Sequence, residues 1–268
     1  MRGGAQSHLM RGADGNFYVV KFQNNPQHSR VLVNEWLATR IAERIGLPVP
    51  VPEIVEVGEW LIRKSAELHI QLGGGRERCC AGLQFGSRFV VDPMAGQALD
   101  YMPESMLDGA HVRNLEIFAG ALVFDKWLCN ADGRQMVYWR HGRERKYTAA
   151  LIDQGYCFNA AEWSFPDSPL RGVFNRNAVY AHIAGWSDFA PWLERIEQFD
   201  AAELGRYAEG IPPEWYAGDW DALQNLLNHI VARRTRVREL IEEFRLSSRD
   251  PFPHWKEAAT AYKAKRLM

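Results

Sequence analysis

The segment Phe17-Tyr18-Val19-Val20-Lys21-Phe22 is a dense run of β-branched and aromatic residues that contains one lysine. Turn-forming residues bound it on both sides, Asp14-Gly15-Asn16 before it and Asn24-Asn25-Pro26 after it, so the pattern predicts a β-strand. Residues 7–10 are predicted to form an antiparallel partner strand. Because an unpaired charge in an apolar strand is costly, Lys21 is expected to have an acidic partner.

Helical periodicity starts at Val31, and Gly46 followed by Pro48 forms a C-terminal stop signal. The pattern predicts an amphipathic helix of about four turns. Glu35 stands near its start, and the loop before the helix is long enough for the carboxylate to point back at the strand. Glu35 is therefore the predicted partner of Lys21, and such a Lys–Glu pair holds nucleotide phosphates in phosphoryl-transfer enzymes.

The remaining chain supplies further elements. Two short strands are expected at residues 54–57 and 61–62, a flexible excursion at 73–78, and a helix buried on every side at 112–128. Residues 135–140 and 147–153 read as a hairpin, and helices are expected at 192–199 and 221–244. This order predicts an α+β, bilobal fold, with a strand-rich N-lobe of residues 1–87 that has one helix and a larger helical C-lobe of residues 88–268.

Composition narrows the class of protein. The 268 residues are 47% apolar, and 32 Lys and Arg face 33 Asp and Glu, for a net charge of −1. These values exclude disordered and membrane classes and argue against direct nucleic-acid binding; the basic segments 140–146 and 263–266 are interpreted as solvated. The four cysteines include no CxxC pair, and no apolar leader opens the chain, so a cytoplasmic protein with reduced thiols is expected.

Two aspartates flank the predicted hairpin. Asp132 lies in Asn130-Ala131-Asp132-Gly133-Arg134-Gln135, after the buried helix, and Asp153 lies in Ile152-Asp153-Gln154-Gly155, at the end of the second strand. An Asp at a strand end followed by x-Gly suits a Mg²⁺ ligand, and Asp132 suits the residue that accepts a proton from, or orients, an attacking hydroxyl. Taken singly, Asp132 is better interpreted as a turn residue and Asp153 as a strand-end cap.

Taken together, a Gly-rich turn, a strand Lys, a helix Glu, a loop Asp and a strand-end Asp-x-Gly follow the order of parts in the protein-kinase superfamily. Several short segments of the sequence resemble motifs of the HipA-like kinase family. They are Gly4-Ala5-Gln6, Asn34-Glu35-Trp36-Leu37-Ala38, Gly46-Leu47-Pro48-Val49-Pro50, Asp125-Lys126-Trp127 and Asn130 to Gln135. The resemblance covers residues 3 to 160 well and the C-terminal third only in its helical character.

The resemblance implies a kinase-like fold that binds ATP with Mg²⁺ between its lobes and transfers the γ-phosphate to a hydroxyl acceptor, as in a serine/threonine protein kinase. The implied catalytic residues are Asp132, Lys21 and Glu35. The implied nucleotide-binding residues are Gly4, Ala5, Gln6, Ser7, His8, Lys21, Gln84 and Phe85, the last two in a connector, Gln84-Phe85-Gly86, that would meet the adenine. The implied metal ligands are Asp153, Gln135 and Asn130. An unidentified acceptor, such as a protein, and a toxin–antitoxin-like protein partner follow from the same resemblance.

Position 137 departs from the kinase pattern. An Asn five residues after the catalytic Asp is the usual second metal ligand, but Val137 stands there, with Gln135 or Asn130 as replacements. A nucleotide-binding pseudokinase is therefore one alternative. A small-molecule kinase of the aminoglycoside phosphotransferase type is another, with Glu203, Glu209, Glu214 and Asp219 as an acidic substrate pocket. No strand precedes the Gly-rich turn, so we expect either an incomplete N-terminus or a mobile turn with low nucleotide affinity.

Overall fold

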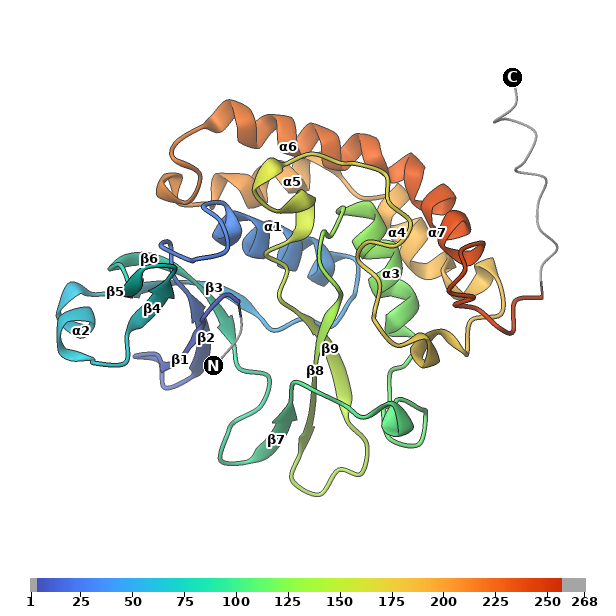
Figure 1. The fold of residues 1–268 in the computed structure, drawn as a ribbon, viewed down its shortest axis with the longest axis horizontal. Helices are drawn as coiled ribbons and strands as arrows, with labels where there is room; N and C mark the ends of the chain where they lie inside the picture. Colours follow the sequence, from blue (N-terminus) through green and yellow to red (C-terminus); the bar gives the residue numbers. More distant parts are fainter. Residues whose placement is uncertain (1–3, 257–268) are drawn as a thin grey trace.

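In the computed structural model, which describes residues 4–256, the chain forms two lobes (Figure 1). The smaller lobe contains a four-stranded sheet with the order β1-β2-β6-β3, and the larger lobe is mainly helical. This arrangement confirms the predicted α+β, bilobal class. The basic tail at residues 263–266 lies outside the described residues, and the lobe boundary at residues 87 and 88 stays a prediction.

All strands of the first sheet are antiparallel: β1 (His8–Arg11), β2 (Phe17–Lys21), β3 (Pro52–Val57) and β6 (Gly82–Arg88). The strands expected at residues 7–10, 17–22 and 54–57 are thus confirmed. Because side chains alternate along a strand, Tyr18 and Val20 pack into a small core on one face. Val19 and Lys21 face the other side, toward the second lobe.

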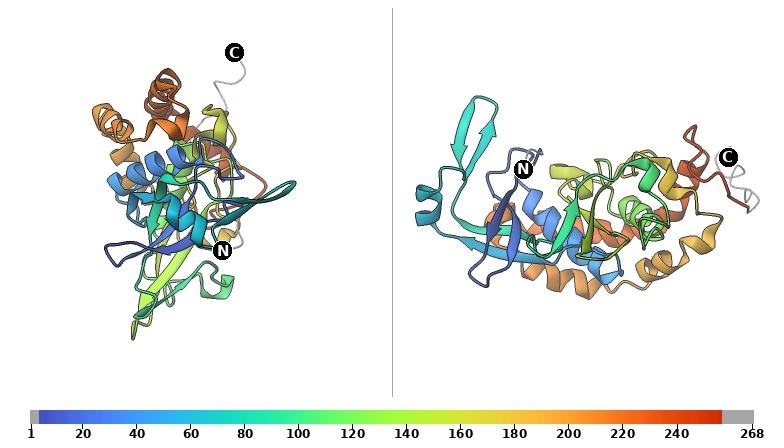
Figure 2. Two further views of the ribbon diagram at one scale, coloured as in Figure 1. Left: turned by 90° about the vertical axis from the view of Figure 1, so that its left-hand side faces the viewer. Right: turned by 90° about the horizontal axis from the view of Figure 1, so that it is seen from below.

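Three expectations for the first lobe are wrong. Residues 61–62 lie in a short helix, α2 (Glu59–Lys64), which starts directly after Gly58. Residues 73–78 belong to a hairpin of β4 (His69–Leu72) and β5 (Gly75–Arg78), because the Gly73-Gly74 turn lets the charged strand pair with its neighbour. Figure 2 shows this hairpin projecting from the body. Residues 84–86 are a central part of β6 and not a connector.

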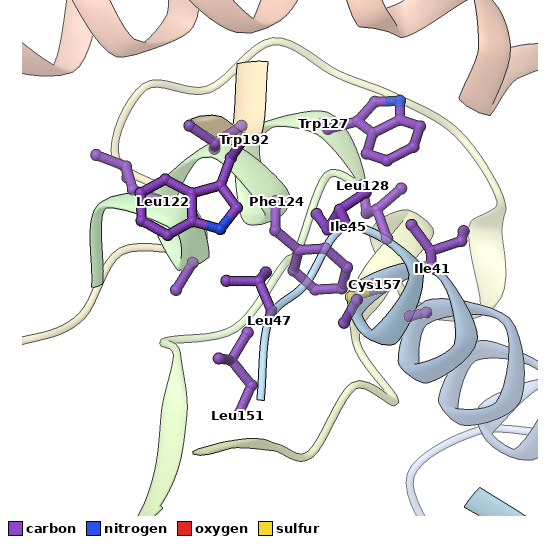
Figure 3. Close-up of a cluster of buried hydrophobic side chains, with 14 of the residues drawn as sticks. Ile41, Ile45, Leu47, Leu122, Phe124, Trp127, Leu128, Leu151, Cys157 and Trp192 are labelled. Atoms are coloured by element: carbon purple, nitrogen blue, oxygen red, sulfur yellow. The ribbon is translucent and has the colours of Figure 1, made fainter. Parts of the chain in front are cut away.

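The position of helix α1 (Val31–Arg44) was predicted correctly, but the helix is not amphipathic, because it is buried on nearly all of its faces. It lies between the sheet and the larger lobe, with contacts to β3, β6 and α5. Figure 3 shows Ile41 and Ile45 at its end against Phe124, Trp127 and Leu128 of the second lobe. The core of the larger lobe therefore extends through α1, which fixes Glu35 relative to both lobes.

The second lobe is built around α3 (Ile117–Trp127), whose side chains are all buried, as the apolar sequence indicates. The hairpin of β8 (Gln135–His141) and β9 (Thr148–Ile152) is confirmed, and the unexpected strand β7 (Gly96–Leu99) pairs with β8. The outer helices are α4 (Ala190–Glu197), α5 (Ala201–Glu209), α6 (Trp220–Arg233) and α7 (Val237–Arg245). Short 3₁₀ segments occur at Glu104–Met106, Cys157–Glu162, Asn177–Tyr180, Trp186–Asp188, Pro213–Tyr216 and Arg234–Arg236.

Two helix boundaries differ from the sequence prediction. The buried helix starts at Ile117 and not at Val112, because Val112 forms a bridge with Tyr147 beside the hairpin. The single helix expected at residues 221–244 is divided by the 3₁₀ turn at Arg234–Arg236, which redirects the chain while the apolar stripe continues. Within residues 4–256, no helix is long and apolar enough to span a membrane.

Candidate functional site

Lys21, Glu35 and Asp153 meet at one point between the lobes, although they are far apart in the sequence. The Lys21 ammonium donates a hydrogen bond of 2.6 Å to Oδ1 of Asp153 and a second, short one to Oε1 of Glu35. The side chains of Lys21 and Glu35 are 8% and 3% exposed, and that of Asp153 is 19% exposed. The predicted Lys–Glu pair therefore exists, with Asp153 as a third member.

The backbone around Asp153 is shaped for this contact. Asp153 follows β9 with φ of 59°, a left-handed conformation that costs energy for a residue with a side chain. Gly155 then passes close to α1: a Cβ at this position would lie 2.7 Å from Val31 Cγ2 and 3.2 Å from Glu35 Oε1. Only glycine lets the Asp-x-Gly segment approach the helix so closely.

Asn34, next to Glu35 in α1, anchors the chain that follows Asp153. Its side-chain amide donates hydrogen bonds to the backbone carbonyls of Gly155, Cys157 and Ala160 at 2.8, 2.9 and 2.9 Å. Its Oδ1 accepts a hydrogen bond of 2.8 Å from the Trp163 indole. The Asn-Glu pair of the sequence motif thus holds both the segment after Asp153 and the lysine, a role that the sequence alone did not assign to Asn34.

The electrostatics of the three groups follow from one cation serving two carboxylates. Burial acts to lower the pKa of Lys21, but Glu35 and Asp153 outweigh it and raise this pKa above its ordinary value. Burial raises the pKa of Glu35 despite the ammonium beside it. Burial also acts to raise the pKa of Asp153, but the charge and hydrogen bond of Lys21 keep it below the usual range. The pKa values of the two carboxylates are thus shifted in opposite directions, upward for the buried Glu35 and downward for the more accessible Asp153.

A cavity of about 510 Å³ opens beside these residues. Lys21, Glu35 and Asp153 form a polar end, and apolar side chains from both lobes line much of the remaining wall. These apolar residues are Val19, Pro50, Phe85, Phe89, Val90, Leu99, Val137 and Ile152. The volume lies in the range of roughly 300–1,000 Å³ typical of small-molecule sites. The cavity therefore offers an apolar slot that leads to a charged end.

Residues 5–7 of the predicted phosphate-covering turn line the cavity, whereas Gly4 and His8 do not. Gln6 ties the turn to β4: its amide donates a hydrogen bond of 2.8 Å to the Gln71 carbonyl and its Oε1 accepts one of 2.6 Å from the Gln71 N–H. Nε2 of His8 lies 3.1 Å from the carbonyl oxygen of Glu67. The turn is thus supported by the β4–β5 hairpin.

The two expected adenine-contacting residues differ in position. Phe85 lines the cavity, but Gln84 is fully buried on the other side of the strand, where its Oε1 accepts a hydrogen bond of 2.8 Å from the Gln23 N–H. The chain that leaves the sheet past the cavity is Ser87 to Val90. The connection between the lobes therefore begins at the end of β6, later than the sequence suggested.

Asp132 is exposed in the loop between α3 and β8, and it lines a smaller hollow of about 260 Å³ instead of the large cavity. Asn130 is buried beneath it, where its Oδ1 accepts a hydrogen bond of 3.1 Å from the Asp132 N–H and its amide donates one of 3.0 Å to Asp125. Asn130 therefore shapes the loop that carries Asp132.

A closed ion pair supports this loop from below. Arg134 donates hydrogen bonds to both carboxylate oxygens of Asp125, one of 2.9 Å from Nε and a short one from Nη2. Its Nη1 donates to the Ile152 carbonyl at 2.9 Å and to Gln154 Oε1 at 2.8 Å, so Arg134 connects the Asp132 loop to the Asp153 segment. Burial opposes the charge of Arg134, but Asp125 outweighs it and raises the pKa. Both residues stand in the quoted motifs, yet the sequence assigned them no role.

Gln135 and Val137 both face the large cavity, because residues two positions apart on a strand lie on the same face of β8. Val137 is 9% exposed and pairs with Ala150 across the hairpin, within the apolar part of the wall. Only Gly133 and Arg134 separate Asp132 from the strand. The position where a kinase usually has its metal-binding Asn therefore falls inside a strand, and Gln135 occupies the start of that strand at the cavity.

The four acids of the alternative substrate pocket line neither of these two hollows. Glu203 accepts hydrogen bonds from Arg44 at 2.8 Å and from the Tyr207 hydroxyl at 2.9 Å. Asp219 caps α6 by accepting a hydrogen bond of 3.0 Å from the Ala222 N–H. These two acids hold helices in place.

Sequence reasoning missed several polar residues of the large cavity, among them Ser87, Arg88 and Asp100. These residues belong to no recognisable sequence motif, and strand pairing and the connection after β6 bring them to the cavity. No signal in the sequence marks them.

Comparison with known proteins adds a family to this geometry. The sequence profile of the HipA-like kinase family matches residues 1–245. The chain belongs to the HipA-like kinase family. The resemblance suggested by the sequence motifs is thereby confirmed. No curated protein sequence matches the chain.

Similarity to a solved structure supports the fold. The proinflammatory kinase CtkA of Helicobacter pylori superposes with a TM-score of 0.52 at 14% identity, over 87% of this chain and 94% of that chain. Weaker likenesses are the Golgi casein kinase with Mn/ADP bound (TM-score 0.47, 12% identity, 91% and 72% covered) and a Shewanella oneidensis HipA complex with HipB and operator DNA (TM-score 0.46, 14% identity, 91% and 66% covered). The likeness to CtkA supports a kinase-like fold for this chain.

Proposed function

We propose that the chain is an ATP- and Mg²⁺-dependent kinase that transfers the γ-phosphate to a serine or threonine hydroxyl of a protein. Membership of the HipA-like kinase family supports a kinase-type phosphotransferase. The observation that carries the proposal is the Lys21 ammonium, held between Glu35 and Asp153 at the polar end of a cavity of ligand size.

The cavity suits a nucleotide from end to end. Its apolar slot accommodates a base, and the exposed Asp100 at the cavity provides an acceptor for ribose hydroxyls. Lys21 binds the phosphates by exchanging its hydrogen bond to the accessible Asp153 for phosphate oxygens, while the buried Glu35 keeps the ammonium oriented. The backbone of residues 5–7 covers the phosphates.

The residues present fit a magnesium ion. Within residues 4–256, no group of three or more His, Cys, Asp and Glu is arranged to hold a metal by itself. Asp153 and Gln135 nevertheless supply a carboxylate and an amide oxygen at the same cavity, and Mg²⁺ is commonly held by one or two side chains together with substrate phosphates. When bound, the ion would neutralise charge on the phosphates. Asn130 has its Oδ1 directed at the Asp132 N–H, so we assign it to the loop.

Asp132 is the proposed acid/base residue. Its exposed carboxylate is free to accept the proton of the acceptor hydroxyl as that oxygen attacks the γ-phosphorus. A new P–O bond forms to the acceptor, the bond from the γ-phosphorus to the ADP oxygen breaks, and the proton passes from Asp132 to water. Arg134 keeps the Asp132 loop and the Asp153 segment in a fixed relation during this step.

The pseudokinase alternative rested on Val137. Because Val137 belongs to the apolar wall and Gln135 lies at the polar side of the same strand, the missing Asn does not by itself argue against transfer. For the small-molecule alternative, none of the four acids lines either hollow, and Glu203 and Asp219 contact other parts of the helical lobe or its neighbours. A toxin–antitoxin-like partner remains a proposal from the family resemblance, and its test is co-purification with the product of an adjacent gene.

A thermal-shift assay tests nucleotide binding directly. The full chain is heated with ATP, with and without Mg²⁺, as wild type, as Asp153→Ala and as the surface control Asp221→Ala. Saturation at a hundredfold excess over Kd stabilises by about 2.7 kcal/mol, so a shift is readily measured. We expect a Mg²⁺-enhanced shift in the wild type and the control, and loss of the enhancement in Asp153→Ala.

Transfer is measured in the same preparation with γ-labelled ATP and phosphoamino-acid analysis. Label on serine or threonine supports the kinase, and its loss in Asp132→Asn supports the assigned role. Absence of any ATP-induced shift contradicts nucleotide binding. A shift without label transfer contradicts the kinase and favours the pseudokinase.

A further inference from the structure

The smaller hollow is distinct from the proposed nucleotide cavity, because the two have no lining residue in common. Asp132 lines only the smaller hollow. Its volume is about 260 Å³. The opposite wall comes from the segment around Leu170 and Arg171, and Arg249, from the chain after α7, completes the rim. A ligand in this hollow would lie against the proposed acid/base residue.

The wall opposite Asp132 is firmly built. Gly172 has φ of +64°, and a Cβ there would lie 2.7 Å from Cβ of Asp125 and 3.2 Å from Cβ of Asn130, so glycine permits the close approach. The buried Lys126 ammonium donates hydrogen bonds to the Pro169 carbonyl at 2.8 Å and to the Arg171 carbonyl. The backbone on both sides of Leu170 is therefore fixed against the loop that carries Asp132.

Two guanidinium groups at the hollow have only neutral partners. Arg171 donates from Nη1 to Asn159 Oδ1 at 2.6 Å. Arg249 donates only from Nη2, to the carbonyls of Phe174 at 3.4 Å and Asn175 at 3.1 Å and to Asn177 Oδ1 at 3.0 Å. Among residues 4–256, neither arginine forms an ion pair with a carboxylate, and that includes Asp132 beside them.

Nearby arginines behave differently. Arg134 pairs with Asp125, Arg233 with Asp167, and Arg245 with Glu242. Arg171 and Arg249 thus differ from these three arginines, because no carboxylate of the described residues compensates their charge. Guanidinium groups bind carboxylates and phosphates through paired N–H donors, and Nε and Nη1 of Arg249 form no hydrogen bond within the part of the chain that the structure describes.

We propose that this hollow is the acceptor site and that it selects a peptide whose acceptor serine or threonine has a negatively charged side chain close by. The proposal rests on the proposed kinase function. The acceptor hydroxyl lies at Asp132, and the neighbouring carboxylate or phosphate pairs with Arg171 and Arg249. Leu170, which is 51% exposed at the same rim, gives a flanking peptide side chain an apolar contact.

Binding to a peptide array tests this selection without requiring catalysis. The array carries a serine flanked at each nearby position by glutamate, phosphoserine, alanine or lysine. The probe is the tagged full chain, saturated with Mg²⁺ and a non-hydrolysable ATP analogue. We expect the glutamate or phosphoserine peptides to bind about tenfold more tightly than their alanine counterparts, since hydrogen bonds to charged groups are the strong ones. The two acidic series distinguish a carboxylate from a phosphate as the preferred anion.

Variants connect the preference to the two arginines. Arg171→Gln and Arg249→Gln should each reduce the acidic preference by about tenfold, whereas the charge-preserving Arg249→Lys should retain part of it. The exposed Arg206 on α5 supplies a matched control, Arg206→Gln, that should leave the preference intact. Where peptides are phosphorylated, KM should rise in the Gln variants while kcat changes little, which a merely misfolded loop would not produce.

The outcomes separate this proposal from the kinase assignment. An ATP-induced thermal shift with no acidic preference on the array overturns the acceptor site but leaves the proposed function standing. An acidic preference that survives in both Arg→Gln variants, or that is lost equally in Arg206→Gln, also overturns it. Absence of the thermal shift overturns the proposed function instead.

Discussion

The Arg134–Asp125 pair and the Lys21 cluster are both buried ion pairs, but they differ in access and in charge balance. Arg134 and Asp125 are 1% and 0% exposed and bind each other through two hydrogen bonds. Lys21 is shared between Glu35 and Asp153, and Asp153 is 19% exposed at the cavity. The first pair is closed and neutral, whereas the second has one carboxylate more than it has cations.

This difference separates a structural role from a functional one. In the closed pair each charged group has one charged partner, so neither group can turn to a ligand without losing its counter-charge. Removing one member leaves an uncompensated buried charge. The Lys21 cluster can release Asp153 to a ligand and still keep Glu35 as a partner. The same residue chemistry therefore stabilises a loop in one place and keeps a site ready for a ligand in the other.

The largest expected effect comes from opening the closed pair. Asp125→Asn leaves the Arg134 guanidinium without a counter-charge and should cost about 3–5 kcal/mol of unfolding free energy. For a chain of this size that corresponds to a fall in Tm of roughly 6–20 °C. Calorimetry should show a much smaller fall for Glu197→Gln, which removes the exposed pair with Arg238. Equal falls in the two variants would contradict the distinction.

Replacing both charges sharpens the same comparison. The double variant Asp125→Leu with Arg134→Met should lose less stability than either single variant, because no buried charge is left unpaired. Additive losses would mean that the pair acts through its separate hydrogen bonds to the loop and not as a unit.

Lys21→Met opens the shared cluster and should cost less, about 1–3 kcal/mol. Without the ammonium, burial raises the pKa of Glu35 and of Asp153 above their unfolded values. The folded state then binds more protons than the unfolded state, so stability is lost as pH rises. The deficit relative to wild type should therefore be larger at pH 8 than at pH 5 in urea unfolding. A deficit that is unchanged or larger at pH 5, or one matched by the exposed control Lys64→Met, would refute this interpretation.

Asp153→Asn should change stability by no more than about 1 kcal/mol, because Lys21 keeps Glu35 and position 153 is partly open. The proposed transfer reaction should nevertheless slow by about 100-fold or more. Parallel measurements of Tm and kcat check the two halves of this prediction. A large loss of stability with little loss of rate would make Asp153 a structural residue like Asp125.

The last prediction concerns the pH dependence of stability at Lys126, next to Asp125. Burial lowers the pKa of Lys126 to about 7 even though Asp125 acts to raise it. An unfolded lysine binds its proton up to pH about 10.4, so between these values the unfolded state holds more protons and stability rises with pH. Lys126→Met should flatten this rise in urea titrations, relative to wild type, with the exposed Lys64→Met as control. Parallel curves for wild type and Lys126→Met would show that Lys126 keeps an ordinary pKa.

Much of the fold was predictable because it depends on local patterns. The β-branched run that contains Lys21, the helical period from Val31 and the hairpin after Asn130 are all present where the sequence indicates them. Apart from helix α2 and two helix boundaries, the failures concern segments whose structure depends on a partner strand. The β4–β5 hairpin and the central strand β6 carry Gly, Arg and Gln, and only pairing makes them strands.

The sequence by itself determined the order of parts: Lys21 on a strand, Glu35 on the next helix, and Asp132 and Asp153 at the ends of later elements. These assignments depend on residue type and spacing, which the chain carries locally. Only the tertiary structure decided that Lys21 is shared between two carboxylates whereas Arg134 pairs with Asp125 alone. It also decided that Val137 belongs to an apolar wall and that Arg171 and Arg249 lie at the same hollow as Asp132. Those facts depend on burial and on contacts between distant segments, because the energy of a charge is set by its surroundings and not by its place in the chain.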